Sequence, residues 1–125
     1  QKCEIIDGYI DDAKYSQLIQ NCDYGILPYT GGTNSGVFST IISFNKPVLS
    51  SDISLFKDSE FSIDELMFGS GNEKDFLRVL ESLMDSSKEK INFFNNIIKN
   101  RIESHKVKFY DELNSSLHSI VNEIN

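Results

Sequence analysis

The sequence has no excess of basic residues and no long apolar run. Lysine and arginine total 12 against 19 aspartates and glutamates, which gives a net charge of −7. Proteins that bind nucleic acids need a surplus of lysine and arginine to neutralise phosphates, so no nucleic-acid partner is expected. No apolar run approaches the roughly 18 residues that predict a membrane-spanning helix.

Cysteine and histidine are also scarce, at two each. Two cysteines, Cys3 and Cys22, do not make a disulfide framework, and we expect two buried thiols in a reducing, cytoplasmic compartment. His105 and His118 are expected on exposed faces of helices near the end of the chain. Since no cysteine and histidine spacing is typical of zinc sites, no metal centre is predicted.

The overall length and composition are typical of one globular domain. The chain has 125 residues, 39% of them hydrophobic, which is enough to form a core. Apolar segments bounded by turn residues predict four short strands, at residues 3–6, 24–27, 48–50 and 65–68. Helices are predicted between the first three, one capped by Asp11 or Asp12 and one capped by Ser35.

The C-terminal part, 71–125, has apolar residues at helical spacing throughout. These residues predict three helices, over 76–84, 91–102 and 109–124. Together with the β/α units of 1–70, this pattern predicts an α/β fold with a Rossmann-like parallel sheet, flanking helices and a helical tail. Four strands are few for such a sheet, so we expect a truncated domain.

Basic residues gather in 86–108, which holds six lysines and arginines against two glutamates. Two interpretations are open: a helix face in contact with solvent, or a contact for a partner or a membrane surface.

The loop from Tyr29 to Phe38 is the strongest candidate for a binding site. It follows a predicted strand, and ligands of parallel α/β sheets bind at the carboxyl ends of strands. The N–H groups of Gly36, Val37 and Phe38 would be free at the start of the next helix, where an anion is favoured. This pattern describes a phosphate cradle without the Gly-Lys-Ser/Thr of a Walker loop. A plain capped turn is the alternative.

Three ordered segments resemble the C-terminal, nucleotide-sugar-binding half of GT-B glycosyltransferases, in particular family 4 and its group 1 relatives. They are residues 23–29 (DYGILPY), 35–40 (SGVFST) and 45–52 (NKPVLSSD). The resemblance covers residues 4 to about 85.

The resemblance implies three sets of donor-binding residues. The donor diphosphate would be bound by Ser35, Gly36 and Val37. The donor sugar would be lined by Tyr29, Thr30, Gly31, Gly32, Thr33 and Asn34. The base and ribose would lie near Tyr9, Ile10 and Thr40.

The sequence departs from the family at the two glutamates that many members carry, because Gly32 and Thr40 stand at those positions. The Thr40 hydroxyl would bond the ribose, as in one branch of the family, and no catalytic residue is assigned.

The implied function is hexosyl transfer from a nucleoside diphosphate sugar to a glycan or lipid-linked acceptor during surface polysaccharide synthesis. An N-terminal GT-B domain would complete the enzyme, and this chain alone is expected to be inactive. No cofactor is implied beyond the nucleotide-sugar substrate. A nucleotide-sugar epimerase of the same fold and a non-catalytic α/β interaction module are the alternatives.

Overall fold

The protein folds around a small parallel sheet. The computed structural model describes residues 3–32, 35–84 and 88–124. Three parallel strands lie in the order β1-β2-β3. Their bounds are β1 Gly25–Leu27, β2 Val48–Ser51 and β3 Met67–Phe68. With helices interleaved between the strands, this architecture confirms the predicted Rossmann-like α/β fold.

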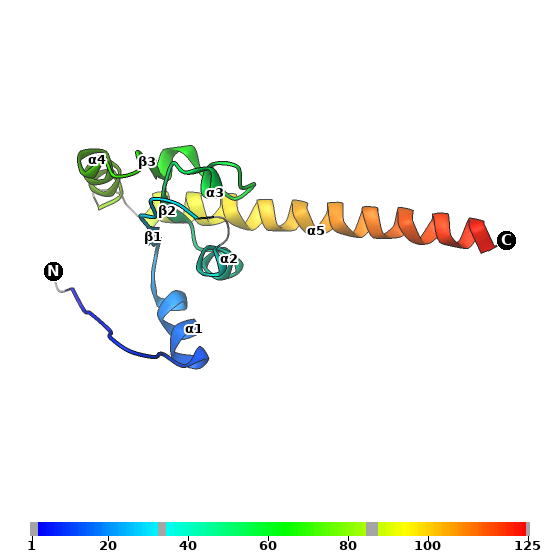
Figure 1. Cartoon of the computed structure of the whole chain (residues 1–125), viewed down its shortest axis with the longest axis horizontal. Helices are drawn as coiled ribbons and strands as arrows, with labels where there is room; N and C mark the ends of the chain where they lie inside the picture. Colours follow the sequence, from blue (N-terminus) through cyan, green and yellow to red (C-terminus); the bar gives the residue numbers. More distant parts are fainter. Residues whose placement is uncertain (1–2, 33–34, 85–87, 125) are drawn as a thin grey trace.

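Helices precede, connect and follow the strands (Figure 1). Helix α2 connects β1 to β2, whereas α3 and the 3₁₀ helix η1 connect β2 to β3. The helices of the described residues are α1 Asp12–Asn21, α2 Gly36–Ser43, α3 Ser54–Lys57, η1 Asp64–Leu66, α4 Glu73–Met84 and α5 Lys88–Ile124.

The predicted helix caps are present. The Asp11 carboxylate accepts a hydrogen bond from the N–H of Lys14 at 2.8 Å, so α1 begins where the sequence predicts. Just beyond the end of α2, Asn45 adopts a φ of 60°, a left-handed conformation that asparagine tolerates. Pro47 follows it and prevents the helix from continuing.

Helix α2 packs closely on the sheet because β1 begins with a glycine. A Cβ atom at Gly25 would lie 2.7 Å from Cδ1 and 3.2 Å from Cγ2 of Ile41. Ile41 is buried in the core, so it has little room to move away. The missing side chain of Gly25 therefore allows the close approach of α2 to β1.

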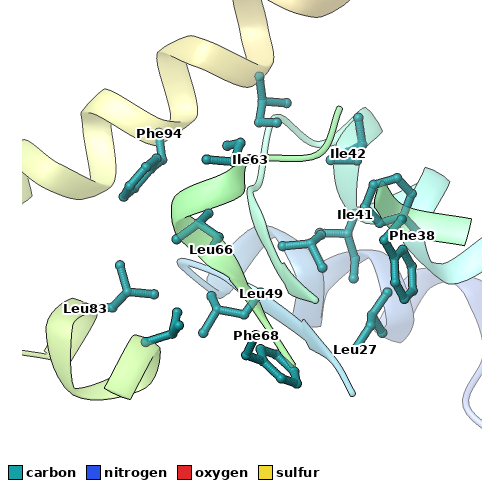
Figure 2. Close-up of a cluster of buried hydrophobic side chains, with 14 of the residues drawn as sticks. Leu27, Phe38, Ile41, Ile42, Leu49, Ile63, Leu66, Phe68, Leu83 and Phe94 are labelled. Atoms are coloured by element: carbon teal, nitrogen blue, oxygen red, sulfur yellow. The ribbon is translucent and has the colours of Figure 1, made fainter. Parts of the chain in front are cut away.

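The hydrophobic core joins the sheet to the first part of α5 (Figure 2). All four residues of β2 are buried, as is typical of a central strand in a parallel sheet. Leu49 and Phe56 are fully buried, and Phe94 and Ile98 of α5 have at most 1% of their surface exposed. Helix α5 is thus anchored by side chains near its start.

Two predicted strands need correction. Residues 3–6 form no strand, and Ile5 is 88% exposed. The described part of 3–10 forms no ladder with the sheet, and an extended segment without such pairing gains no strand stability. The strand predicted at 65–68 covers only Met67–Phe68, because η1 takes up the residues before it.

The C-terminal helices also differ from the prediction. The helix over 76–84 is confirmed by α4, but the two helices predicted over 91–102 and 109–124 are one continuous helix, α5, of 37 residues. No glycine or proline interrupts residues 88–124, so nothing in the backbone stops the helix. At 1.5 Å per residue α5 is about 55 Å long. Figure 1 shows its distal half projecting from the rest of the protein.

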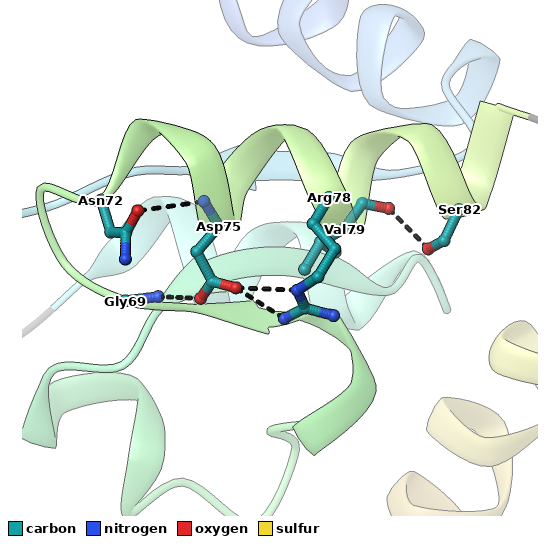
Figure 3. A network of polar contacts seen from close by, with 6 residues as sticks. All are labelled: Gly69, Asn72, Asp75, Arg78, Val79 and Ser82. Carbon is teal, nitrogen blue, oxygen red and sulfur yellow. Dashed lines mark hydrogen bonds and ion pairs between the residues drawn. The ribbon is translucent and has the colours of Figure 1, made fainter.

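A polar network fixes the turn between β3 and α4 (Figure 3). The Asp75 carboxylate accepts hydrogen bonds from the N–H of Gly69 at 2.6 Å and from Nε of Arg78 at 2.9 Å. The bond from Gly69, and then that from Arg78, lowers the pKa of Asp75 below its usual range.

This network predicts an acid-dependent contribution of Asp75 to stability. A carboxylate with a lowered folded-state pKa stabilises the fold fully above its unfolded-state pKa, and this stability is lost as the pH falls through the folded-state pKa. The advantage of the native chain over Asp75→Asn should therefore be largest near pH 7 and should shrink below about pH 4. Urea unfolding of both chains between pH 2 and pH 7 measures it, and a difference independent of pH would contradict it.

Within the described ranges, no helix is both long enough and apolar enough to cross a membrane.

Candidate functional site

The start of α2 lies at the carboxyl end of β1, where the sequence predicts a site. Ser35 is buried at 8% exposure, and its hydroxyl oxygen accepts a hydrogen bond from the N–H of Phe38 at 3.0 Å. The N–H groups of Gly36 and Val37 form no hydrogen bond with any described residue. Both residues are exposed, so these two donors face solvent at the positive end of the helix dipole.

One of the predicted donors is not available. The N–H of Phe38 is occupied by the Ser35 hydroxyl oxygen, so the expectation that it is free is wrong. The cause is the cap itself, because an N-cap serine satisfies the N–H three residues later. The Ser35 oxygen acts as acceptor in this bond, which leaves its own proton available. The cradle therefore offers two backbone N–H groups and this hydroxyl.

The loop that leads into α2 is anchored at its beginning. The Tyr29 carbonyl accepts a hydrogen bond from the Ser51 hydroxyl at 2.5 Å, and Ser51 is fully buried at the end of β2. The Tyr29 ring packs on Phe56, with a centroid separation of 5.5 Å. These contacts join the carboxyl ends of β1 and β2, so the loop begins from a fixed point. The sequence offers no local signal for a bond between residues this far apart.

The next residues of the loop face solvent. Thr30, Gly31 and Gly32 are exposed, and Gly32 has a φ of +146°, which favours glycine over any other residue. A glutamate at this position would be strained. Thr33 and Asn34, which the sequence also assigns to the sugar, lie outside the described residues.

Of the residues assigned to the base and ribose, Thr40 lies one turn of α2 from the cradle, whereas Tyr9 and Ile10 lie before α1. The Thr40 hydroxyl donates to the carbonyl of Gly36 at 2.8 Å, so its proton is used within α2 and its oxygen can only accept. Tyr9 is 91% exposed and Ile10 is partly exposed, both on the N-terminal segment before α1. Figure 1 shows this segment lying apart from the sheet.

The basic residues of 86–108 do not share one face of α5. Lys99 and Lys106 are seven residues apart and lie on one face, whereas Arg101 and Lys108 lie about 160° away on another. The Arg101 side chain makes hydrogen bonds within the fold, because its guanidinium donates to the carbonyls of Glu60 and Ser62. Residues 86 and 87 lie outside the described part of the chain.

His105 lies on the same exposed side of α5 as Arg101. Its Nδ1 is 3.0 Å from a carboxylate oxygen of Glu60, and its ring meets that of Phe61 edge-on. With the Arg101 bonds, these contacts attach the turn after α3 to α5. His105 thus has partners in the fold, which the sequence pattern did not indicate.

Few of the other described residues have side chains suited to binding a metal ion or to nucleophilic attack. Among them, no three histidine, cysteine, aspartate or glutamate side chains are placed to hold a metal ion. Burial raises the pKa of the Cys22 thiol, which makes it a poor nucleophile, and its Sγ donates to the carbonyl of Ile19. Cys3 is exposed, so the expectation of a buried thiol is wrong there, because the whole stretch 3–9 is exposed.

The arrangement can bind an anion through backbone N–H groups, and it places no acid or base of shifted pKa beside them. Comparison of the chain with models of protein families, with curated proteins and with solved structures finds no match.

Proposed function

We propose that this chain is the donor-binding part of a GT-B-type glycosyltransferase. The enzyme would transfer a sugar from a nucleoside diphosphate sugar to a glycan or lipid-linked acceptor. The observation that carries the proposal is the pair of unpaired N–H groups of Gly36 and Val37, at the start of an eight-residue helix and at the carboxyl edge of a parallel sheet. That is where such folds bind phosphate groups.

The positions of the three family-like segments support this proposal. Residues 23–29 lead into and out of β1, residues 35–40 begin α2, and residues 45–52 contain β2. In this arrangement the segments converge on one edge of the sheet. The Ser51 bond to the Tyr29 carbonyl ties two of them together directly beside the cradle.

The strength of binding follows from the groups present. Two N–H groups at a helix terminus contribute about 1–2 kcal/mol toward an anion. The cradle itself contains no basic side chain, and the chain carries a net charge of −7. A nucleoside diphosphate should therefore bind this chain only weakly, with a dissociation constant well above 1 mM, because 1 mM corresponds to about 4 kcal/mol. The remaining affinity would come from residues of the other GT-B domain.

An amide NMR titration with the diphosphates of uridine, guanosine, adenosine and cytidine tests the proposal. Shifts confined to Tyr29–Phe38 are expected, and a preference for one base would name the class of donor. Inorganic pyrophosphate is the control that separates recognition of the diphosphate from recognition of the base. A folded spectrum with no shift at Gly36 and Val37 at any concentration up to tens of millimolar would contradict the site and favour a non-catalytic module.

A further inference from the structure

A second concave site lies between α2 and α5 and shares Ser35 with the cradle. The pocket has a volume of about 750 Å³, within the range of sites for small molecules. Its apolar lining comes from three helices and the turn after α3, and Figure 1 shows α2 running below the first half of α5. The apolar residues are Phe38, Ile42, Leu55, Phe61 and Ile102. Such a lining favours a hydrocarbon chain or a ring.

On the wall formed by α2, the Ser35 hydroxyl keeps a free proton, whereas the Ser39 and Ser43 hydroxyls donate within the helix. The Ser39 hydroxyl donates to the carbonyl of Ser35 at 3.3 Å, and the Ser43 hydroxyl donates to the carbonyl of Thr40 at 2.6 Å. Their oxygens can still accept hydrogen bonds, but an anion needs donors. Ser39 and Ser43 therefore do not bind a negative group.

The opposite rim, formed by α5, carries the charges. Lys99, Ile102, Glu103 and Lys106 are spaced by three, four and seven residues, so all four lie on the face of α5 that lines the pocket. Neither lysine forms an ion pair with a described residue. The rim thus holds two available ammonium groups around one carboxylate.

We propose that this pocket binds a single-chain amphiphile with an anionic headgroup. The apolar chain would lie on Phe38, Ile42 and Ile102, and the headgroup would lie at the α5 rim between Lys99 and Lys106. Glu103 limits the charge that the rim accepts, because its carboxylate repels the same headgroup. The pocket shares Ser35 with the proposed donor site, but the charged groups that carry this inference belong to α5.

Octyl phosphate, octanol and inorganic phosphate separate the two halves of the proposed ligand. Amide NMR shifts at Ser39 and Ile102 should saturate with octyl phosphate, below its micellar concentration, and should be at least about fivefold weaker with either of the other two. Equal binding of octanol would overturn the proposal, because the rim would then recognise no charge. Shifts centred on exposed apolar residues of distal α5, such as Leu117, would overturn it as well.

Charge variants give the sharper test, because two substitutions on the same face of α5 should change the affinity for octyl phosphate in opposite directions. Lys106→Gln should weaken octyl phosphate about three- to fivefold, and Glu103→Gln should tighten it by a similar factor. Lys108→Gln is the matched control, since Lys108 lies on α5 but does not line this pocket, and it should leave the affinity within about 1.5-fold. Equal weakening by Lys106→Gln and Lys108→Gln would overturn the site.

Ser39→Phe tests the cavity itself. Ser39 is exposed on α2 and lines the pocket, so an aromatic ring there would fill the space without entering the core. We expect loss of octyl phosphate binding with unchanged urea unfolding and unchanged shifts from nucleoside diphosphates. Retained binding in a folded Ser39→Phe variant would overturn the proposal while leaving the donor site untouched.

Discussion

Phe94→Ala is expected to destabilise the fold by about 3–5 kcal/mol, the largest effect of any substitution considered for this protein. Phe94 is 1% exposed and belongs to the cluster that joins α5 to the sheet. Its ring also meets that of Tyr24 edge-on, at a centroid separation of 6.5 Å. The truncation would leave a cavity at the point where α5 is anchored. Urea unfolding followed by far-UV circular dichroism measures the loss.

The neighbouring residue provides the control. Phe93 has the same side chain on the same turn of α5, but it is 55% exposed. Phe93→Ala should cost about 1 kcal/mol or less, because it removes little buried surface and introduces a better helix former. Equal losses for the two variants would mean that α5 is not anchored through Phe94.

Gly36→Val should weaken the binding of a nucleoside diphosphate at least about tenfold, which corresponds to about 1.4 kcal/mol. The reason is steric, because a branched side chain at the first residue of α2 would stand beside the two N–H groups that receive the anion. The fold should tolerate the change, since a Cβ atom at Gly36 would have no neighbour within 4 Å. The slope of the amide shifts against diphosphate concentration measures the effect.

Ser43→Val places the same new side chain at the other end of α2, about 10 Å along the helix. It should leave diphosphate binding unchanged. If both variants bind as the native chain does, the N–H groups of Gly36 and Val37 are not the anion site. Unfolding of the chain by Gly36→Val would contradict the open surroundings of this glycine.

Local patterns were sufficient to predict most of the elements. The caps at Asp11 and Ser35 act on N–H groups three residues away, so the sequence around each helix start contains the whole signal. The same holds for Asn45 and Pro47, which end α2 by their own backbone preferences. The parallel sheet followed from the alternation of strand and helix.

The predictions from the sequence that are wrong or incomplete concern interactions between distant residues. Residues 3–6 have the composition of a strand, but a strand exists only where another strand accepts its hydrogen bonds. The bond from Ser51 to the Tyr29 carbonyl and those from Arg101 to the turn after α3 leave no local pattern in the sequence. The pocket between α2 and α5 was unforeseen for the same reason, since it exists only once the two helices pack together.

The close approach of α2 to β1 at Gly25 means that a residue outside the cradle affects the position of the N–H groups of the cradle. Helix α2 spans eight residues, and its Ile41 lies so close to β1 that a Cβ atom at Gly25 would be only 2.7 Å from Cδ1 of Ile41. A methyl group added at Gly25 would push α2 away from β1 and would move the N–H groups at the start of the helix with it. Affinity for an anion would then change although every donor remained present, because the aim of those donors would have moved.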